Sequence, residues 1–149
     1  DVLLARHYES IKPIIHLLDR TEMPHKVYYG LRDKGCYYNS MPVARAMLTA
    51  NGVQPKHIVL QEEDGTYQIN SQKQFDLIVS LISWGFHYPI STYLDQAYDK
   101  LADKGILILD VRKQHGGIEQ LQQKFGKVKI IFDAQKHVRA VCQKQSSVA

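Results

Sequence analysis

Side chains that could do chemistry stand directly after short apolar runs of this sequence. Asp19 ends the run 13–18, and Arg112 follows the run 106–111. A carboxylate offers two acceptor oxygens to hydroxyl groups, and an arginine can hold a carboxylate or a phosphate through two parallel hydrogen bonds. The structural alternatives are a turn or cap for Asp19 and a surface ion pair for Arg112. Both residues are therefore candidates for ligand binding.

An aromatic turn supplies the candidate for proton transfer. This turn extends from Trp84 to Tyr88, and the side chain of His87 within it can accept a proton near neutral pH. His87 could thus activate a hydroxyl or amine group for attack. In the alternative interpretation His87 caps the helix that Ser91 or Thr92 begins, and Trp84 fills the core.

Apolar runs predict the strands that must position these residues. The short apolar runs 14–18, 57–60, 75–83 and 106–111 are typical of strands buried on both faces of a parallel sheet. Four residues join the later runs 128–132 and 137–142, and so short a connection permits only an antiparallel hairpin.

Capping signals predict the helices between these strands. One helix should begin at Asn39 or Ser40 and stop before Asn51–Gly52, and a short one should follow Gly116–Gly117. The helix that begins at Ser91 or Thr92 should close at Lys104–Gly105. The segment 20–39 is too long for an ordinary connection and suggests a functional loop. This alternation predicts an α/β fold with a mostly parallel sheet, an antiparallel C-terminal β-hairpin and a single domain over residues 1–149.

The composition excludes several classes of protein. With 149 residues, 44% hydrophobic and 23% charged, the chain is neither disordered nor collagen-like. The longest nearly apolar run, 75–84, is too short to cross a membrane, and the N-terminus carries no signal peptide. We therefore expect a cytoplasmic protein that does not associate with membranes.

Charge and cysteines point to no special partner. The net charge is +4, but the basic residues are scattered along the sequence, which favours a solvated basic face over nucleic-acid binding. Cys36 and Cys142 lie 106 positions apart without metal-ligand spacing. We expect two reduced thiols and no metal site.

Four segments of the chain resemble the class I methyltransferases, which use S-adenosylmethionine. They are the run 14–19, the acidic turn after 57–61, the strand 75–80 and the segment 101–109. In that family a strand of the Phe-Asp-Leu-Ile-Val-Ser type ends at the cofactor, and a helix that ends in a glycine turn leads into the next strand. The resemblance covers nearly the whole chain. It implies a doubly wound, Rossmann-like sheet whose ligand lies beyond the carboxyl ends of the strands.

The resemblance also implies roles for individual residues. Asp19 stands where the family's acid accepts the ribose hydroxyls of the cofactor, and Asp64, with Glu62 and Glu63 as rivals, stands where the adenine amino group is bound. Trp84 would pack on the adenine or on the positively charged methylsulfonium. The remaining candidates are Ser80 and Ser83 toward the cofactor and Tyr88 and Arg112 toward the substrate. A solvated acidic turn and a core tryptophan are the alternatives.

One feature of the family is missing from this sequence. The glycine-rich cofactor loop and its strand should come before Asp19, and the sequence begins too late to contain them. The resemblance puts that strand between the strands 14–18 and 75–83. We therefore expect a methyltransferase-like domain truncated at its N-terminus, whose intact parent binds the cofactor while these 149 residues bind it poorly.

The sequence thus predicts transfer of a methyl group from S-adenosylmethionine to an oxygen or nitrogen of a small molecule. A sugar is the suggested acceptor, because the tyrosine-rich segment 20–39 and Trp84 offer stacking surfaces. Two alternatives stay open. In an NAD-dependent oxidoreductase Asp19 would hold the ribose of the dinucleotide, and a non-catalytic binding domain would need no acceptor base. The antiparallel hairpin favours the methyltransferase over the oxidoreductase.

Overall fold

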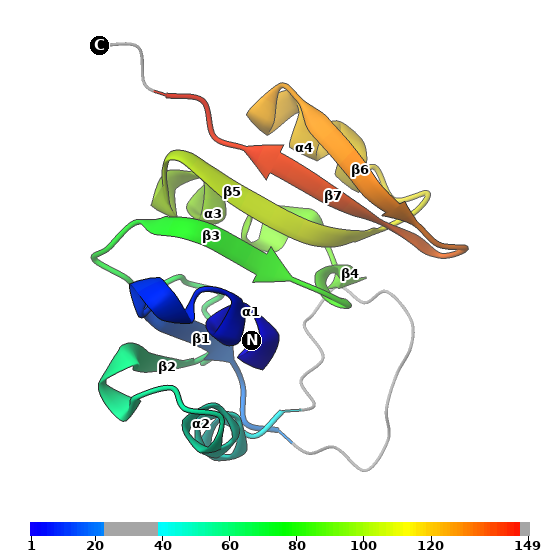
Figure 1. Cartoon of the computed structure of the whole chain (residues 1–149). Coiled ribbons are helices and arrows are strands. Elements are labelled where there is room, and N and C mark those ends of the chain that lie inside the picture. The colour runs from blue at the N-terminus through cyan, green and yellow to red at the C-terminus, as the bar shows by residue number, and fades with distance from the viewer. Residues whose placement is uncertain (23–38, 147–149) are drawn as a thin grey trace. The chain divides into compact units, whose positions relative to one another are not determined.

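The computed structural model describes residues 1–22 and 39–146, which divide into two compact units. The first unit contains the described residues 1–22 and 39–66, and the second contains residues 67–146. Most of the predicted loop 20–39, including Cys36, lies outside the described residues. Each unit has a sheet of its own (Figure 1).

The sheet of the first unit consists of two parallel strands. They are β1 (Ile15–Asp19) and β2 (Ile58–Glu62), which pair in register from end to end. The helices of this unit are α1 (Val2–His7) and α2 (Met41–Ala50), with 3₁₀ turns at Glu9–Ile11 and Pro55–His57. Ala5, Leu48 and Ile58 form its core, so both helices and β2 contribute apolar side chains.

The helix α2 begins where the capping signals predicted. Ser40 is its N-cap residue, Pro42 lies in its first turn, and Asn51 is its C-cap. Its buried side chains are Met41, Ala44 and Leu48, at the spacing of one helix face. The predicted parallel orientation of the first two strands and the predicted helix between them are therefore confirmed.

The second unit contains a four-stranded sheet in the order β3-β5-β7-β6. Its elements in chain order are β3 (Phe75–Ser80), β4 (Ser83–Tyr88), a 3₁₀ turn (Ile90–Thr92), α3 (Leu94–Lys100), β5 (Leu101–Arg112), α4 (Gly117–Phe125), β6 (Val128–Asp133) and β7 (His137–Gln143). β3 and β5 are parallel, whereas β7 is antiparallel to both β5 and β6. The predicted C-terminal hairpin and the short helix after Gly116–Gly117 are confirmed.

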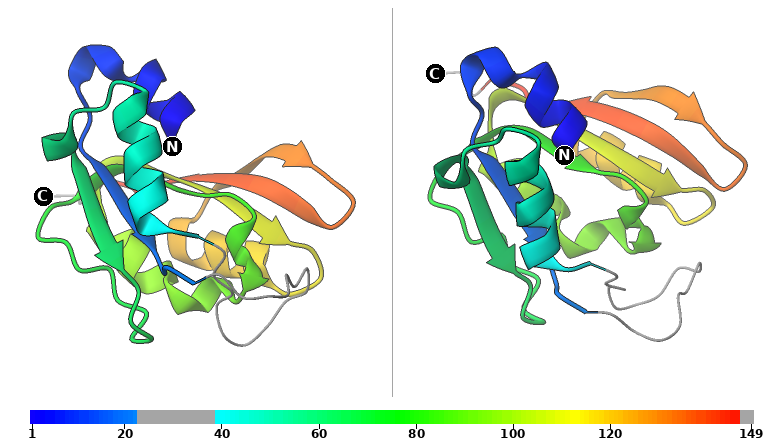
Figure 2. Two further views of the ribbon diagram at one scale, coloured as in Figure 1. Left: turned by 90° about the horizontal axis from the view of Figure 1, so that it is seen from below. Right: turned by 60° about the horizontal axis from the view of Figure 1, so that its bottom comes forward.

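The helices α3 and α4 cover one face of this sheet (Figure 2). Alternate residues of β5 and β7 are buried on that face, as the two-residue period of a strand requires: Leu107, Leu109, Val111, Val138, Ala140 and Cys142. Gly117 lets α4 approach β5, because a Cβ atom there would lie 2.6 Å from the Val111 side chain.

The expectation of one mostly parallel, doubly wound sheet is wrong. The described strands form a two-stranded parallel sheet and a separate four-stranded sheet that is mostly antiparallel. β1 pairs with β2 and not with β3, and β3, which the apolar run 75–83 predicted as a strand buried in one parallel sheet, is an edge strand of the second sheet. Apolar runs indicate that strands are buried, but they do not specify which strands are neighbours.

Two predicted elements also have different bounds. The run 75–83 is not one strand, because it turns at Leu81 and Ile82, both exposed, and continues as β4. The helix expected to begin at Ser91 begins at Leu94 and ends at Lys100, and the chain enters β5 directly at Leu101. Leu101 is fully buried and pairs with Phe75, so its apolar side chain belongs to the strand and not to the helix.

Candidate functional site

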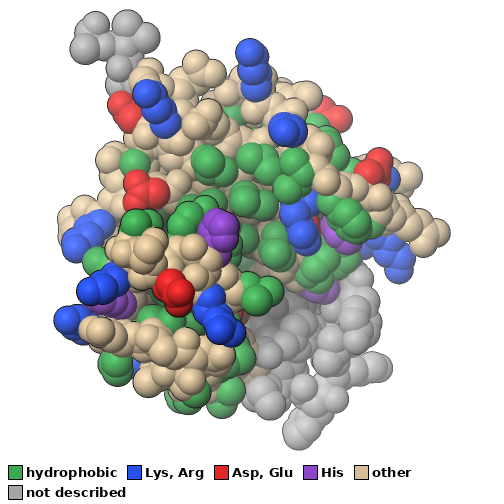
Figure 3. Space-filling view, in the orientation of Figure 1, with side chains coloured by type: hydrophobic (Ala, Val, Ile, Leu, Met, Phe, Trp, Pro, Cys, Tyr) green, Lys and Arg blue, Asp and Glu red, His purple; other side chains and the backbone are tan. Residues whose placement is uncertain are grey.

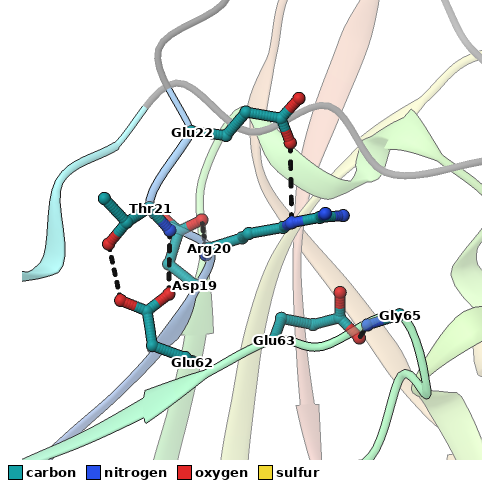
Figure 4. A network of polar contacts seen from close by, with 7 residues as sticks. All are labelled: Asp19, Arg20, Thr21, Glu22, Glu62, Glu63 and Gly65. Carbon is teal, nitrogen blue, oxygen red and sulfur yellow. Dashed lines mark hydrogen bonds and ion pairs between the residues drawn. The ribbon is translucent and has the colours of Figure 1, made fainter.

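The carboxyl ends of β1 and β2 bring two acidic side chains next to each other. Asp19 and Glu62 are register partners at the ends of these parallel strands. The chain continues past them through Thr21 and through the acidic turn that begins at Glu63 (Figure 4). This group of polar side chains lies within the first unit and is the strongest candidate site among the described residues.

Asp19 is held by neighbours that leave acceptor capacity on its carboxylate. Its Oδ1 accepts a hydrogen bond from the backbone N–H of Arg20 at 2.8 Å, and its Oδ2 accepts one from Asn39 Nδ2 at 2.9 Å. Asn39 is itself oriented, because its Oδ1 accepts from the N–H of Ser40 at 2.8 Å. Each carboxylate oxygen has a second lone pair. The half-buried carboxylate can therefore accept further hydrogen bonds from a diol.

The pKa of Asp19 reflects this environment. Burial raises the pKa above its ordinary value, and the hydrogen bonds from Arg20 and Asn39 act in the opposite direction. Glu62 raises it further through charge repulsion. Removing water from a carboxylate strengthens any hydrogen bond that a ligand hydroxyl donates to it.

Thr21 connects three elements beside Asp19. Its hydroxyl donates to Glu62 Oε1 at 2.5 Å and accepts from the N–H of Met41, the first residue of α2, at 3.2 Å. Its own N–H donates to Glu62 Oε2 at 2.9 Å. These hydrogen bonds lower the pKa of Glu62. The ends of β1 and β2 and the start of α2 are thus joined through one side chain.

The acidic turn uses its carboxylates to stabilise its own backbone. Glu63 is buried, its N–H donates to the Asp19 carbonyl at 2.8 Å, and its side chain accepts from the N–H of Gly65 at 2.8 Å. Asp64 is exposed and accepts from the N–H and the hydroxyl of Thr66, which lower its pKa. In Asp64 one oxygen, Oδ1, makes both contacts, so Oδ2 has capacity for a ligand.

The predicted aromatic residues of β4 lie in the core of the second unit. Trp84 is 5% exposed, donates its indole N–H to the Ile90 carbonyl at 2.8 Å and packs edge-on against Tyr93. His87 is 7% exposed and packs edge-on against Phe86. Because α3 begins at Leu94 with Tyr93 as its N-cap, the helix cap considered for His87 at Ser91 does not form. Tyr88 is also buried.

The remaining predicted site residues also belong to the second unit. Ser80 is half-buried and donates to the Trp84 carbonyl at 3.4 Å, and Ser83 is half-buried at the start of β4. Arg112 donates to the Phe86 carbonyl at 2.8 Å, and its guanidinium lies 4.2 Å from the centre of the Phe86 ring. The predicted residues are therefore divided, with Asp19 and Asp64 in the first unit and the other six in the second.

Two polar arrangements escaped the sequence analysis. Asn39 was interpreted as a helix cap, and the residues around it in the sequence do not indicate that its side chain donates a hydrogen bond to Asp19. Asp110 is fully buried and accepts from Arg139 through both oxygens, at 2.8 and 3.0 Å, and from the N–H of Ile82 at 3.1 Å. The pair raises the pKa of Arg139. The local signal for Asp110 is its place near the end of the apolar run 106–111, and that place does not identify its partner.

No protein-family model matches this chain, and no curated protein sequence matches it significantly. Within residues 1–22 and 39–146, three or more His, Cys, Asp or Glu side chains do not gather where they could hold a metal ion. The described helices are all too short or too polar to cross a membrane.

Proposed function

We propose that this chain belongs to an S-adenosylmethionine-dependent methyltransferase that acts on a small molecule, and that Asp19 binds the ribose of the cofactor. The carboxylate of Asp19 carries the proposal. It lies at the carboxyl end of a parallel strand, it is half-buried, and each of its oxygens has a lone pair for a hydroxyl. Because the neighbours of Asp19 already fix its orientation, a diol would bind without further ordering of the carboxylate.

The arrangement of strands gives a second line of support. In the second unit an antiparallel hairpin follows the last parallel strand, as in the family that the sequence resembles. This pattern favours a methyltransferase over a dinucleotide-dependent oxidoreductase.

The chemistry proposed for the chain is positioning. S-adenosylmethionine, when bound, supplies a methyl carbon that an oxygen or nitrogen nucleophile attacks. Asp19 would hold the ribose, and Oδ2 of Asp64 could accept a hydrogen bond from the adenine amino group. His87 is kept as the hypothetical acceptor base. Its side chain is buried against Phe86, so an acceptor would have to reach it inside the second unit.

Substitution of Asp19 tests the proposal. Asp19→Ala removes both acceptor oxygens, whereas Asp19→Asn keeps the shape and one of them. We expect Asp19→Ala to weaken binding of S-adenosylhomocysteine by about 1.5 to 3 kcal/mol, the range for a hydrogen bond to a charged group, and Asp19→Asn to weaken it less. Affinities can be measured by calorimetry or, for weak binding, by NMR titration.

Asp76→Ala is the matched control, because Asp76 is exposed on β3 in the other unit. It should bind S-adenosylhomocysteine as the wild type does. Equal affinity in wild type and Asp19→Ala, with both proteins folded, would remove Asp19 from the site and with it the observation on which the proposal rests.

A further inference from the structure

Positive charge is concentrated in the last third of the chain. Residues 110–144 contain eight Lys and Arg against three Asp and Glu, a net charge of +5, while the remaining residues contain eleven against twelve. Four of the eight basic residues belong to β5, α4, β6 and β7, which pack together in the second unit, and the other four lie in the connections between these elements or directly after β7. The fold therefore brings together basic residues that lie apart in the sequence.

Several of these residues share the sheet face that α3 and α4 do not cover. Register partners on neighbouring strands project from the same face of a sheet. Arg112 on β5 pairs with His137 on β7, and Lys129 on β6 pairs with Val141. These positions alternate with the residues buried under the helices, such as Val138 and Ala140. We call this surface, formed by Arg112, Lys129, Phe132, His137 and Arg139, the basic face.

An exposed aromatic ring lies within the basic face. Phe132 pairs with Arg139 in the β6–β7 register and is 51% exposed. The Arg139 guanidinium lies 5.7 Å from the centre of the Phe132 ring, and the His137 ring lies 5.8 Å from it in a tilted arrangement. In Figure 3 hydrophobic, basic and histidine side chains gather where Figure 1 draws the tip of the β6–β7 hairpin. Asp110 fixes Arg139, so the ring stands among ordered neighbours.

We propose that the basic face binds single-stranded nucleic acid, with a base stacked on Phe132 and the phosphates near Lys129 and Arg112. Exposed aromatic rings on a sheet, surrounded by cations, stack bases without preference for sequence, and the surrounding charge attracts the backbone. A second copy of this chain would bring two positively charged faces together, which charge repulsion opposes. The proposal does not depend on the cofactor site, because no residue of the basic face belongs to that site.

Fluorescence anisotropy with a labelled oligothymidylate of about 20 nucleotides tests the proposal, since binding modules of this kind cover roughly 4–16 nucleotides. We expect saturable binding that weakens as salt is added. Phe132→Ala should weaken it by about 5- to 150-fold, the equivalent of the loss of one stacked base. Lys129→Gln should reduce the slope of log affinity against log salt by about 0.7, the value for one phosphate contact on a single strand.

Two control variants distinguish binding at the basic face from a general effect of charge and from loss of folding. Lys73→Gln removes an exposed cation outside the basic face and should change neither affinity nor slope. Phe132→Tyr keeps an aromatic ring and should bind nearly as the wild type does, which guards against loss of folding in Phe132→Ala. Binding that Phe132→Ala leaves unchanged, or no saturable binding at low salt, would overturn the proposal. Self-association that Phe132→Ala abolishes, without oligonucleotide binding, would identify the face as a dimer interface and also overturn it.

Discussion

At the scale of single residues, Asp19 shows what a sequence can and cannot predict. Its place at the end of an apolar run was enough to identify it as a candidate ligand residue. Asn39, which donates a hydrogen bond to Asp19, lies 20 positions later in the sequence. Thr21, which donates to the neighbouring Glu62, lies two positions after Asp19. The sequence analysis identified neither residue as part of the site. Such hydrogen bonds depend on which segments of the chain lie beside the end of β1. The periodicity of apolar residues does not predict which segments these are.

Thr21 should couple stability to pH through Glu62. The folded pKa of Glu62 lies below its ordinary value, so this carboxylate contributes stability above the unfolded pKa and loses the contribution as the pH falls through the folded pKa. Thr21→Val removes the hydroxyl donor. We expect a loss of about 0.5 to 1.5 kcal/mol in the free energy of unfolding at neutral pH, the range for one net hydrogen bond.

The loss caused by Thr21→Val should become smaller in acid, as the pH falls through the folded pKa of Glu62, which lies below its ordinary value. Urea denaturation of wild type, Thr21→Val and Thr21→Ser at neutral and at acidic pH measures the loss. Thr21→Ser keeps the hydroxyl and serves as the control. An equal loss at both pH values would assign the effect to the second contact of Thr21, the hydrogen bond from Met41.

Cys142 should be an inert thiol in the native protein. It is buried under the helices of the second unit, and burial raises its pKa to about 11. The thiolate is the reactive form, so little of it exists at neutral pH. In a Cys36→Ser background, where Cys142 is the remaining thiol, we expect a disulfide reagent to react slowly until denaturant is added. Rapid reaction in the absence of denaturant would contradict the buried position.

At the scale of elements, an ion pair between the fully buried Asp110 and the partly exposed Arg139 connects strands that are distant in the sequence. Asp110 on β5 binds Arg139 on β7 and the backbone of Ile82 between β3 and β4. Ile82 has a positive φ of 51°, a conformation that most side chains avoid. The carboxylate of Asp110 therefore stabilises the turn that ends the predicted long strand 75–83.

Replacing Arg139 alone should destabilise the second unit more than replacing both Arg139 and its ion-pair partner Asp110. Arg139→Met leaves the fully buried Asp110 without its cation, and such uncompensated charges cost about 3–5 kcal/mol. Adding Asp110→Asn to Arg139→Met should recover part of that loss, because the remaining group is neutral. Chemical denaturation of both variants measures the difference. Equal stability of the single and double variants would show that the charge of Asp110 is not the cause.

The elements themselves were largely predictable, and their neighbours were not. Capping residues identified α2, and the glycines ahead of Ile118 identified α4. A four-residue connection was sufficient to predict the β6–β7 hairpin. The break at Ile82 was hidden because Leu81 and Ile82 are apolar and yet exposed, so they extended the apolar run past the end of β3.

At the scale of the whole molecule, the two sheets should differ in stability. β5 and β7 each have neighbours on both sides, whereas β1 and β2 pair only with each other among the described strands. Isolated two-stranded sheets are marginally stable. We expect the amides of β5 and β7 to exchange with deuterium much more slowly than those of β1 and β2, as measured by mass spectrometry of peptides. Equal protection in both sheets would show that the two units open together.

An NMR titration tests the central claim, that the carboxyl end of β1 binds the ribose of S-adenosylhomocysteine. The ligand is added to the isotopically labelled chain at concentrations up to the millimolar range, with NAD in a parallel titration. We expect S-adenosylhomocysteine to shift the amide signals of Arg20, Thr21 and Glu63 in a saturable way, and to bind more tightly than NAD. Tighter binding of NAD would favour an oxidoreductase. The absence of saturable shifts at these amides would contradict the claim.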